Sequence, residues 1–151
     1  VDDLSFERRP YDAYGAYAQS KLATLLFLAE LQRRLTAAGT TLRATGAHPG
    51  YTATAIMRQT GSRAFNALAG VGNRVAGMAV ERGVLPVLFA ATMDVPGNTY
   101  LGPHGPFELR GKPVPVGRSE AAASPDLAKA LWRRSEELTG TVFPLGDVTP
   151  S

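Results

Sequence analysis

The longest uninterrupted feature of the sequence is a segment from Tyr14 to Ala38 that contains no proline and has a glycine only near its start, Gly15. It is rich in Ala, Leu, Gln, Glu, Lys and Arg, which are strong helix formers, and Gly39 ends it. A short strand is expected from Thr40 to Ala47, before His48-Pro49-Gly50 interrupts the chain. A long helix followed by a strand predicts an α/β protein.

The rest of the chain continues this pattern less regularly. The expected elements are loosely packed helices between Ile56 and Val80, a helix from about Val80 to Thr92, a strand from Asn98 to Gly102, a loop from Pro103 to Pro115 and a last helix up to Leu138. Ser124 and Pro125 predict the start of the last helix, and Gly140 follows its end.

Composition and charge exclude several classes of protein. The chain has 151 residues, of which 44% are hydrophobic, enough for the core of one domain and too many for a disordered tail. It has 16 basic and 13 acidic residues, and the net charge of +3 is too small to indicate nucleic-acid binding. No cysteine is present, so disulfides, thiolate catalysis and cysteine-ligated zinc are excluded.

The sequence also bears on location and completeness. It has no apolar run of about 18 residues and no signal-like start, which predicts a cytoplasmic protein without a membrane span. The chain begins at Val1 rather than methionine, and its first residues are typical of the middle of a loop. We therefore expect it not to be a complete natural protein.

Tyr17 and Lys21 form the sharpest chemical pattern. A four-residue spacing on a helix places a phenol and an ammonium on one face, one turn apart, so both can act on one ligand. A nearby positive charge favours a phenolate, which lets a tyrosine exchange a proton with a substrate hydroxyl or carbonyl. The same spacing also arises by chance in amphipathic helices, where the tyrosine packs and the lysine is solvated. The surrounding sequence must decide between these interpretations.

That sequence resembles the short-chain dehydrogenase/reductase family. In the family Tyr-x-x-x-Lys, often with Ser directly before Lys, is followed about 30 residues later by Pro-Gly-x-x-x-Thr. The matching positions here are Tyr17, Ser20 and Lys21, and then Pro49, Gly50 and Thr54. The resemblance is nearest to the retinol-dehydrogenase-like branch, which has Ala-Tyr-x-x-Ser-Lys-Leu-Ala and His-Pro-Gly at these places. It extends through the Phe107–Gly111 loop to the helix with Leu131 and Trp132.

The resemblance implies roles for individual residues. Tyr17 would be the general acid/base for hydride transfer between a nicotinamide and a carbonyl or alcohol. Lys21 would stabilise the phenolate form of Tyr17 and hydrogen-bond the nicotinamide ribose. The following loop would lie against the nicotinamide amide, and Thr54 would be the side chain in most direct contact. The loop residues with this implied role are Pro49, Gly50, Tyr51, Thr52 and Thr54.

The resemblance also implies a fold and ligands. The chain would be the C-terminal part of a Rossmann-like, doubly wound parallel sheet, a single partial domain whose dinucleotide-binding half precedes the catalytic Tyr in the family. Residues 56–80 would form a substrate lobe, and their apolar content favours a small apolar carbonyl or alcohol. The cofactor would be NADP or NAD, with the preference for NADP taken from the branch alone. The activity would belong to a longer parent, and the chain alone would be inactive.

A second interpretation makes the chain a truncated, inactive protein that serves as a dimerisation or interaction module. Leu22 to Leu31 would supply the apolar surface, because in the family this helix often pairs with its copy in a homodimer. The oxidoreductase interpretation is favoured, because half of a parallel sheet on its own would lack neighbouring strands. Its buried strand would then leave an exposed sheet edge.

Other residues receive structural interpretations. Ser5 is a weak candidate for the catalytic serine of the family, because no apolar strand precedes it. His48 and His104 have no acidic cluster beside them, so no metal site is expected, and His48 is interpreted as a loop histidine near the cofactor. Trp132 is expected in the core, and the paired arginines of the helices on solvated faces.

Overall fold

The computed structural model describes residues 2–50 and 80–145, and everything below refers to these ranges. The chain divides into two compact units. The first contains residues 1–44, 96–98 and 118–151, and the second contains residues 45–95 and 99–117. The loosely packed helices and substrate lobe expected within residues 56–79 lie outside the described residues.

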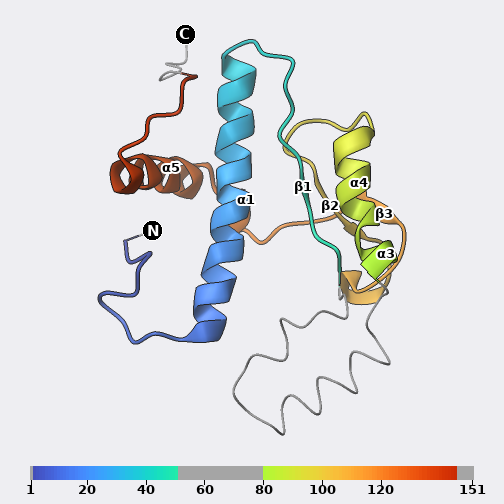
Figure 1. Ribbon diagram of the computed structural model, residues 1–151, viewed down its shortest axis with the longest axis horizontal. Coiled ribbons are helices and arrows are strands. Elements are labelled where there is room, and N and C mark those ends of the chain that lie inside the picture. The colour runs from blue at the N-terminus through green and yellow to red at the C-terminus, as the bar shows by residue number, and fades with distance from the viewer. Residues whose placement is uncertain (1, 51–79, 146–151) are drawn as a thin grey trace, which may run out of the picture. The chain divides into compact units, whose positions relative to one another are not determined.

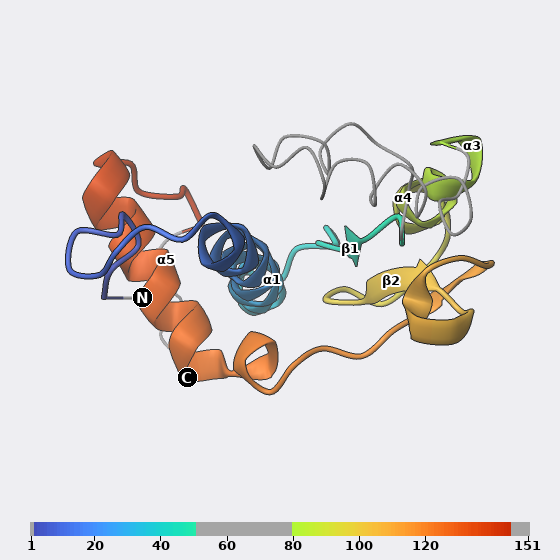
Figure 2. The same ribbon diagram turned by 90° about the horizontal axis from the view of Figure 1, so that it is seen from below.

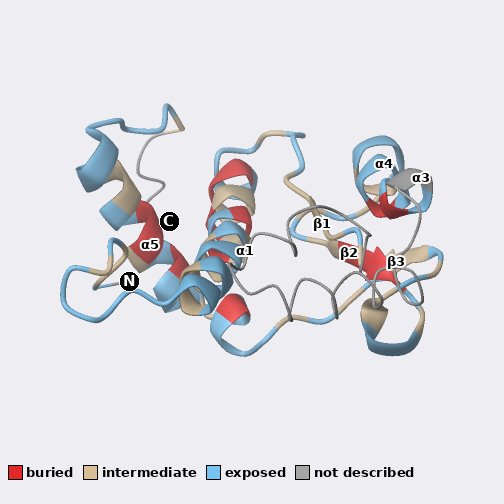
Figure 3. Cartoon of the chain, turned by 60° about the horizontal axis from the view of Figure 1, so that its bottom comes forward, coloured by how far each residue is buried: buried red, intermediate tan, exposed pale blue. Residues whose placement is uncertain are grey.

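The first unit is built on two helices, α1 (Ala13–Ala37) and α5 (Pro125–Thr139), with a short 3-10 turn, η3 (Ala121–Ala123), before α5. Helix α5 lies beside α1 (Figure 1). The core cluster consists of Leu26 from α1 with Ala128 and Leu131 from α5. Figure 3 shows the buried positions of this unit on these helices. Burial of their apolar side chains is the main term that stabilises the pair.

The start and end of α5 follow the sequence prediction. The Ser124 hydroxyl accepts a hydrogen bond from the Leu127 N–H at 3.3 Å, which satisfies one of the free donors of the first turn. Gly140 ends the helix in a left-handed conformation, with φ 64°. Trp132 is buried, as expected.

The second unit contains a three-stranded sheet in the order β1-β2-β3. Its elements are β1 (Gly46–Ala47), α3 (Val80–Gly83), α4 (Leu85–Thr92), β2 (Tyr100–Pro103), η2 (Pro106–Glu108) and β3 (Pro113–Pro115). Strands β1 and β2 run parallel, with Gly46 opposite Tyr100, and β2 and β3 run antiparallel, with Gly102 opposite Val114. Figure 2 shows β1 beside β2. The fold is therefore mixed α/β, as the sequence predicted at this level.

Two predictions about the sheet were wrong, one about a strand and one about a loop. The strand expected from Thr40 is reduced to Gly46–Ala47, because backbone pairing with the β2 segment begins only at Ala44, whose carbonyl accepts from the Asn98 N–H. The loop expected from Pro103 contains a third strand, Pro113–Pro115. The prolines argued against a strand, because they lack the N–H that pairing between strands requires. They are tolerated here because β3 pairs with β2 alone in the described sheet.

The helix expected from Val80 to Thr92 is interrupted. It forms α3 and α4, which are separated by a turn at Val84. Pro86 is the cause, since a proline ring removes one backbone donor and clashes with the carbonyl four residues earlier. Within the described ranges, no helix is long and apolar enough to cross a membrane.

Candidate active site

The first turn of α1 begins at a strong cap. The Asp12 carboxylate accepts a hydrogen bond from the Gly15 N–H at 2.6 Å. A Cβ on Gly15 would lie 2.8 Å from this carboxylate oxygen, so the glycine leaves room for the cap. A negative charge at this end also interacts favourably with the helix dipole. The cap fixes the start of the helix, and therefore which residues follow on each of its faces.

Tyr17 and Lys21 lie one turn apart on the same face of α1. The Lys21 Nζ is 5.2 Å from the centroid of the Tyr17 ring, so the ammonium and the phenol share one surface. Tyr17 is 54% exposed, and Lys21 is also exposed. Among the described residues, none hydrogen-bonds the Tyr17 hydroxyl. The pair can therefore meet a ligand from solvent.

Ser20 does not join the pair through its side chain. Its hydroxyl donates to the Tyr17 backbone carbonyl at 2.7 Å, an ordinary bond for a helical serine. Ser5, the weak serine candidate, lies in a turn rather than at the end of a strand.

The second half of α1 is anchored by a buried ion cluster. Glu30 is 2% exposed and accepts from Arg33 Nε at 2.8 Å and from Arg34 Nε at 2.9 Å. Burial alone would raise the pKa of the Glu30 carboxyl, but the hydrogen bonds and charges of the two arginines outweigh it and lower the pKa. The Arg34 guanidinium also covers the Trp132 ring, with Cζ 4.6 Å from the ring centroid. The cluster ties α1 to α5.

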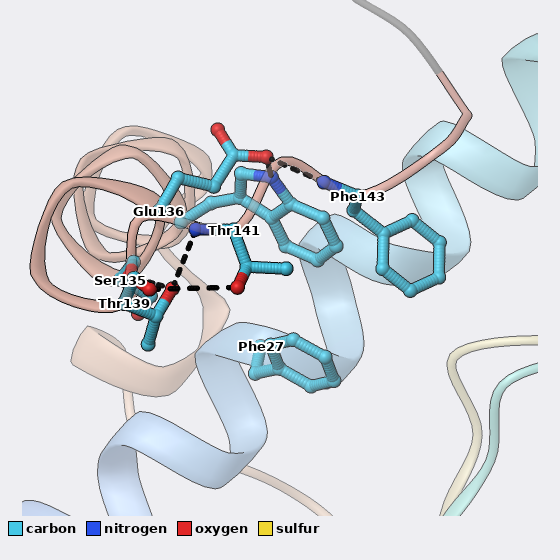
Figure 4. Close-up of a pocket in the computed structure, with 7 residues that line it drawn as sticks. Phe27, Ser135, Glu136, Thr139, Thr141 and Phe143 are labelled. Atoms are coloured by element: carbon cyan, nitrogen blue, oxygen red, sulfur yellow. Dashed lines mark hydrogen bonds between the residues drawn. The ribbon is translucent and has the colours of Figure 1, made fainter.

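Aromatic residues add a second contact between α1 and α5. The Phe27 and Trp132 rings are stacked, with centroids 5.1 Å apart, and the Trp132 Nε1–H donates to Glu136 at 2.8 Å. A pocket of about 320 Å³ opens beside them (Figure 4). It is lined by Phe27, Trp132, Ser135, Glu136, Thr139, Thr141 and Phe143. Neither Tyr17 nor Lys21 lines this pocket, which is separate from the candidate chemistry.

The Pro-Gly motif lies in the second unit. Gly50 has φ 72°, a left-handed conformation that favours glycine. A Cβ there would lie 2.6 Å from the Leu109 carbonyl oxygen and 2.8 Å from that of Glu108, so the turn is closely packed against this loop. Pro49 is exposed. Tyr51, Thr52 and Thr54 lie outside the described residues.

Both ring nitrogens of His48 lie within hydrogen-bond distance of neighbouring groups. Its Nε2 lies 3.0 Å from a Glu108 carboxylate oxygen, and its Nδ1 lies 3.2 Å from the Gly50 nitrogen. Sequence reasoning missed Glu108, because the two residues are 60 positions apart and no periodicity links them. The one signal was that Glu108 lies in the Phe107–Gly111 segment that carried the family resemblance. Within the described ranges, no group of three or more His, Asp or Glu residues is placed to hold a metal ion.

Several known proteins are similar to this chain. No protein-family model matches the chain. It is 32% identical over 151 residues to human retinol dehydrogenase 13, and the aligned region covers 95% of this chain and 42% of that protein. It is also 32% identical over 136 residues to mouse polyprenol dehydrogenase, and the aligned region covers 88% of this chain and 38% of that protein. A crystal structure of an uncharacterized protein from Mycobacterium paratuberculosis matches with a TM-score of 0.73 and 43% identity, over 95% of this chain and 45% of that one.

These named relatives are members of the short-chain dehydrogenase/reductase family, and the chain matches the C-terminal portion of these larger proteins. Its relatives are dehydrogenases, as the Tyr17 and Lys21 pattern indicated. The chain spans about two fifths of the length of these curated relatives, 42% for the human protein and 38% for the mouse one.

Proposed function

We propose that this chain carries the catalytic Tyr–Lys pair of an NAD(P)-dependent oxidoreductase. The observation that carries the proposal is the exposed Tyr17 phenol with the Lys21 ammonium 5.2 Å from its ring, on one face of α1. Similarity to members of the short-chain dehydrogenase/reductase family supports it, because Tyr17 and Lys21 have the spacing of that family's Tyr-x-x-x-Lys motif. Both side chains face solvent and have donors to spare, so they fit a substrate oxygen and a ribose hydroxyl.

The chemistry follows from these two groups. When bound, a nicotinamide supplies or accepts the hydride at the substrate carbon. In the reducing direction the Tyr17 hydroxyl gives its proton to the carbonyl oxygen, and in the oxidising direction the phenolate takes the proton from the alcohol. Lys21 stabilises the negative charge that Tyr17 carries after it releases the proton. Proton transfer by a positioned group of this kind typically accelerates a reaction by about 10²- to 10⁴-fold.

The cofactor would also be held by the turn after β1. Pro49 and Gly50 supply a rigid backbone there, and the proposal extends to Tyr51, Thr52 and Thr54, which follow in the motif. NADP is the preferred cofactor, on the strength of the resembling branch. The substrate class is an apolar alcohol or carbonyl, since retinol and polyprenol, named in two relatives, are both apolar alcohols.

A complete site needs more than these residues. The proposed parent fold is a Rossmann-like parallel sheet, in which a first half binds the dinucleotide. The chain covers 42% of the human relative, which supports assigning the activity to a longer protein and expecting the 151 residues alone to be inactive. A cytoplasmic location remains a prediction.

The decisive experiment replaces Tyr17 by Phe in the complete natural protein. We expect turnover of an apolar alcohol to fall by at least about 10²-fold, while the Kd for NADPH changes little, because only the proton donor is lost. Tyr14→Phe is the matched control, since Tyr14 lies one turn earlier on α1, is 80% exposed and has no lysine four residues on. Equal turnover of the Tyr17 and Tyr14 variants would refute the proposal.

The interaction-module alternative predicts a different result. Leu26 and Leu28 are buried within the first unit, while Phe27 is exposed. A homodimer through α1 would therefore have to use Phe27 and the partly exposed leucines around it. Sedimentation of the wild type and of a Phe27→Ser variant would test it, and a monomeric wild type would exclude this dimer.

A further inference from the structure

Both ring nitrogens of His48 are engaged, which fixes the position of its proton. The Gly50 N–H donates to Nδ1 at 3.2 Å, so Nδ1 accepts and carries no hydrogen. In a neutral imidazole the proton is then on Nε2, which lies 3.0 Å from the Glu108 carboxylate and donates to it. The two bonds therefore select one tautomer and one ring orientation.

The surroundings of the ring leave little freedom. A Cβ on Gly102 of β2 would collide with the His48 imidazole, so this glycine makes space for the ring. The Tyr100 ring lies on the same strand with its centroid 5.3 Å from that of His48. The His48 side chain is only 24% exposed. Rotation of the imidazole would therefore cost both packing and hydrogen bonds.

The loop that supplies Glu108 is itself in an unfavourable conformation. Phe107 and Glu108 are not glycines, yet they have φ 53° and φ 56°. A left-handed backbone is unfavourable for residues with a side chain, and it persists where surrounding contacts over-determine it. The contacts here are the Glu108 bond to His48 and the close approach of Gly50 to the Glu108 carbonyl.

We propose that His48, held by Glu108, is a positioning residue that sets the Pro49–Gly50 turn for cofactor binding. The inference rests on the proposed function, in which this turn lies against the nicotinamide. The essential bond is the one from Gly50 N–H to Nδ1, because it defines the backbone direction directly after Pro49. Glu108 acts one step further away, by keeping the proton on Nε2.

Two substitutions separate the two ring nitrogens. In His48→Asn the amide oxygen lies near the place of Nδ1 and can still accept from Gly50, whereas in His48→Gln the amide nitrogen lies near the place of Nε2 and can reach Glu108 instead. His104→Asn is the matched control, because His104 Nδ1 also accepts a backbone N–H, but from Lys112 at 2.9 Å and not from the Pro-Gly turn.

The first measurement is the Kd for NADPH of the complete natural protein. We expect the Gln variant to bind about tenfold more weakly, the Asn variant to retain most of the affinity, and the His104 variant to match the wild type. The Asn and Gln variants carry the same amide group, so a split in affinity between them is a result that a merely structural role would not predict. Wild-type affinity in the Gln variant would overturn the inference.

A second measurement is independent of catalysis. Nitrogen NMR of the neutral His48 imidazole should show its proton on Nε2, and Gly50 amide exchange should be about tenfold faster in the Gln than in the Asn variant. A proton on Nδ1, or equal exchange rates, would contradict the positioning role. If the wild type binds no nicotinamide cofactor, the proposed function fails, and these two observations still decide whether His48 holds the turn.

Discussion

The two halves of α1 differ in what surrounds them. The first half exposes Tyr14 and Tyr17, whereas every buried residue of the helix lies in the second half, from Leu26 to Leu35. The second half packs on α5 and contains a buried ion cluster. A helix is stiff along its axis, so the packed half can fix the direction of side chains that have few contacts of their own. Helix α1 therefore separates the residues that stabilise it from those with a proposed catalytic role.

The strongest test of this separation removes core volume from the packed half. Leu26→Ala should lower the free energy of unfolding by about 3 kcal/mol, because Leu26 is almost fully buried against Ala128 and Leu131. Urea unfolding would measure the change. Leu42→Ala is the control, since Leu42 is exposed and should change stability by less than about 0.5 kcal/mol. Equal losses in both variants would mean that the packed half does not anchor the helix.

The next test concerns the charge in the same half. Glu30→Gln should destabilise the fold by about 2 kcal/mol, because Arg34 would keep its buried charge without a carboxylate. Glu137→Gln is the matched control, since its ion pair with Arg134 is exposed and should contribute less than about 0.5 kcal/mol. A smaller loss at Glu30 than at Glu137 would show that the buried cluster does not stabilise α1.

The same cluster predicts how stability depends on pH. The arginines lower the folded-state pKa of Glu30 below its ordinary value of 4.5, so the stabilising contribution is present above pH 4.5. It is lost as pH falls through the lowered folded-state pKa, because the carboxylate then takes up a proton in the folded protein too. Urea unfolding between pH 3 and pH 7 should show a steeper acid decline for the wild type than for Glu30→Gln. Parallel curves would contradict the prediction.

These differences also explain what the sequence could reveal. Local signals were enough for α1 and α5, because composition, caps and the glycine after α5 act within a few residues of each other. The Tyr17 and Lys21 pair was equally readable, since one turn of helix brings the two together. Their roles in catalysis remain a prediction.

Contacts between residues far apart in the chain could not be predicted from the sequence. The length of β1 depends on where the β2 segment begins to pair with it, some 50 residues later, and β3 was masked by its prolines. The bond between His48 and Glu108 joins residues 60 positions apart, and the buried Glu30 cluster depends on α5 covering α1. Such contacts follow from tertiary packing, which local propensity does not encode.

The smallest expected effect belongs to the helix caps, which test whether the exposed half of α1 behaves as an independent region. Asp12→Ala removes the cap of α1, and Ser124→Ala removes the corresponding cap of α5. Each should lower stability by about 1 kcal/mol. The exposed half of α1 has little packing to resist fraying, so the Asp12 variant should also lose about two- to threefold in turnover.

Ser124→Ala is the informative control, because α5 carries no proposed catalytic group. It should lose similar stability in urea unfolding and keep wild-type turnover in the complete natural protein. If both variants lost turnover equally, activity would simply follow global stability, and the exposed half of α1 would not be an independent region. If Asp12→Ala alone lost turnover, the cap would be shown to hold Tyr17 and Lys21 in place where packing does not.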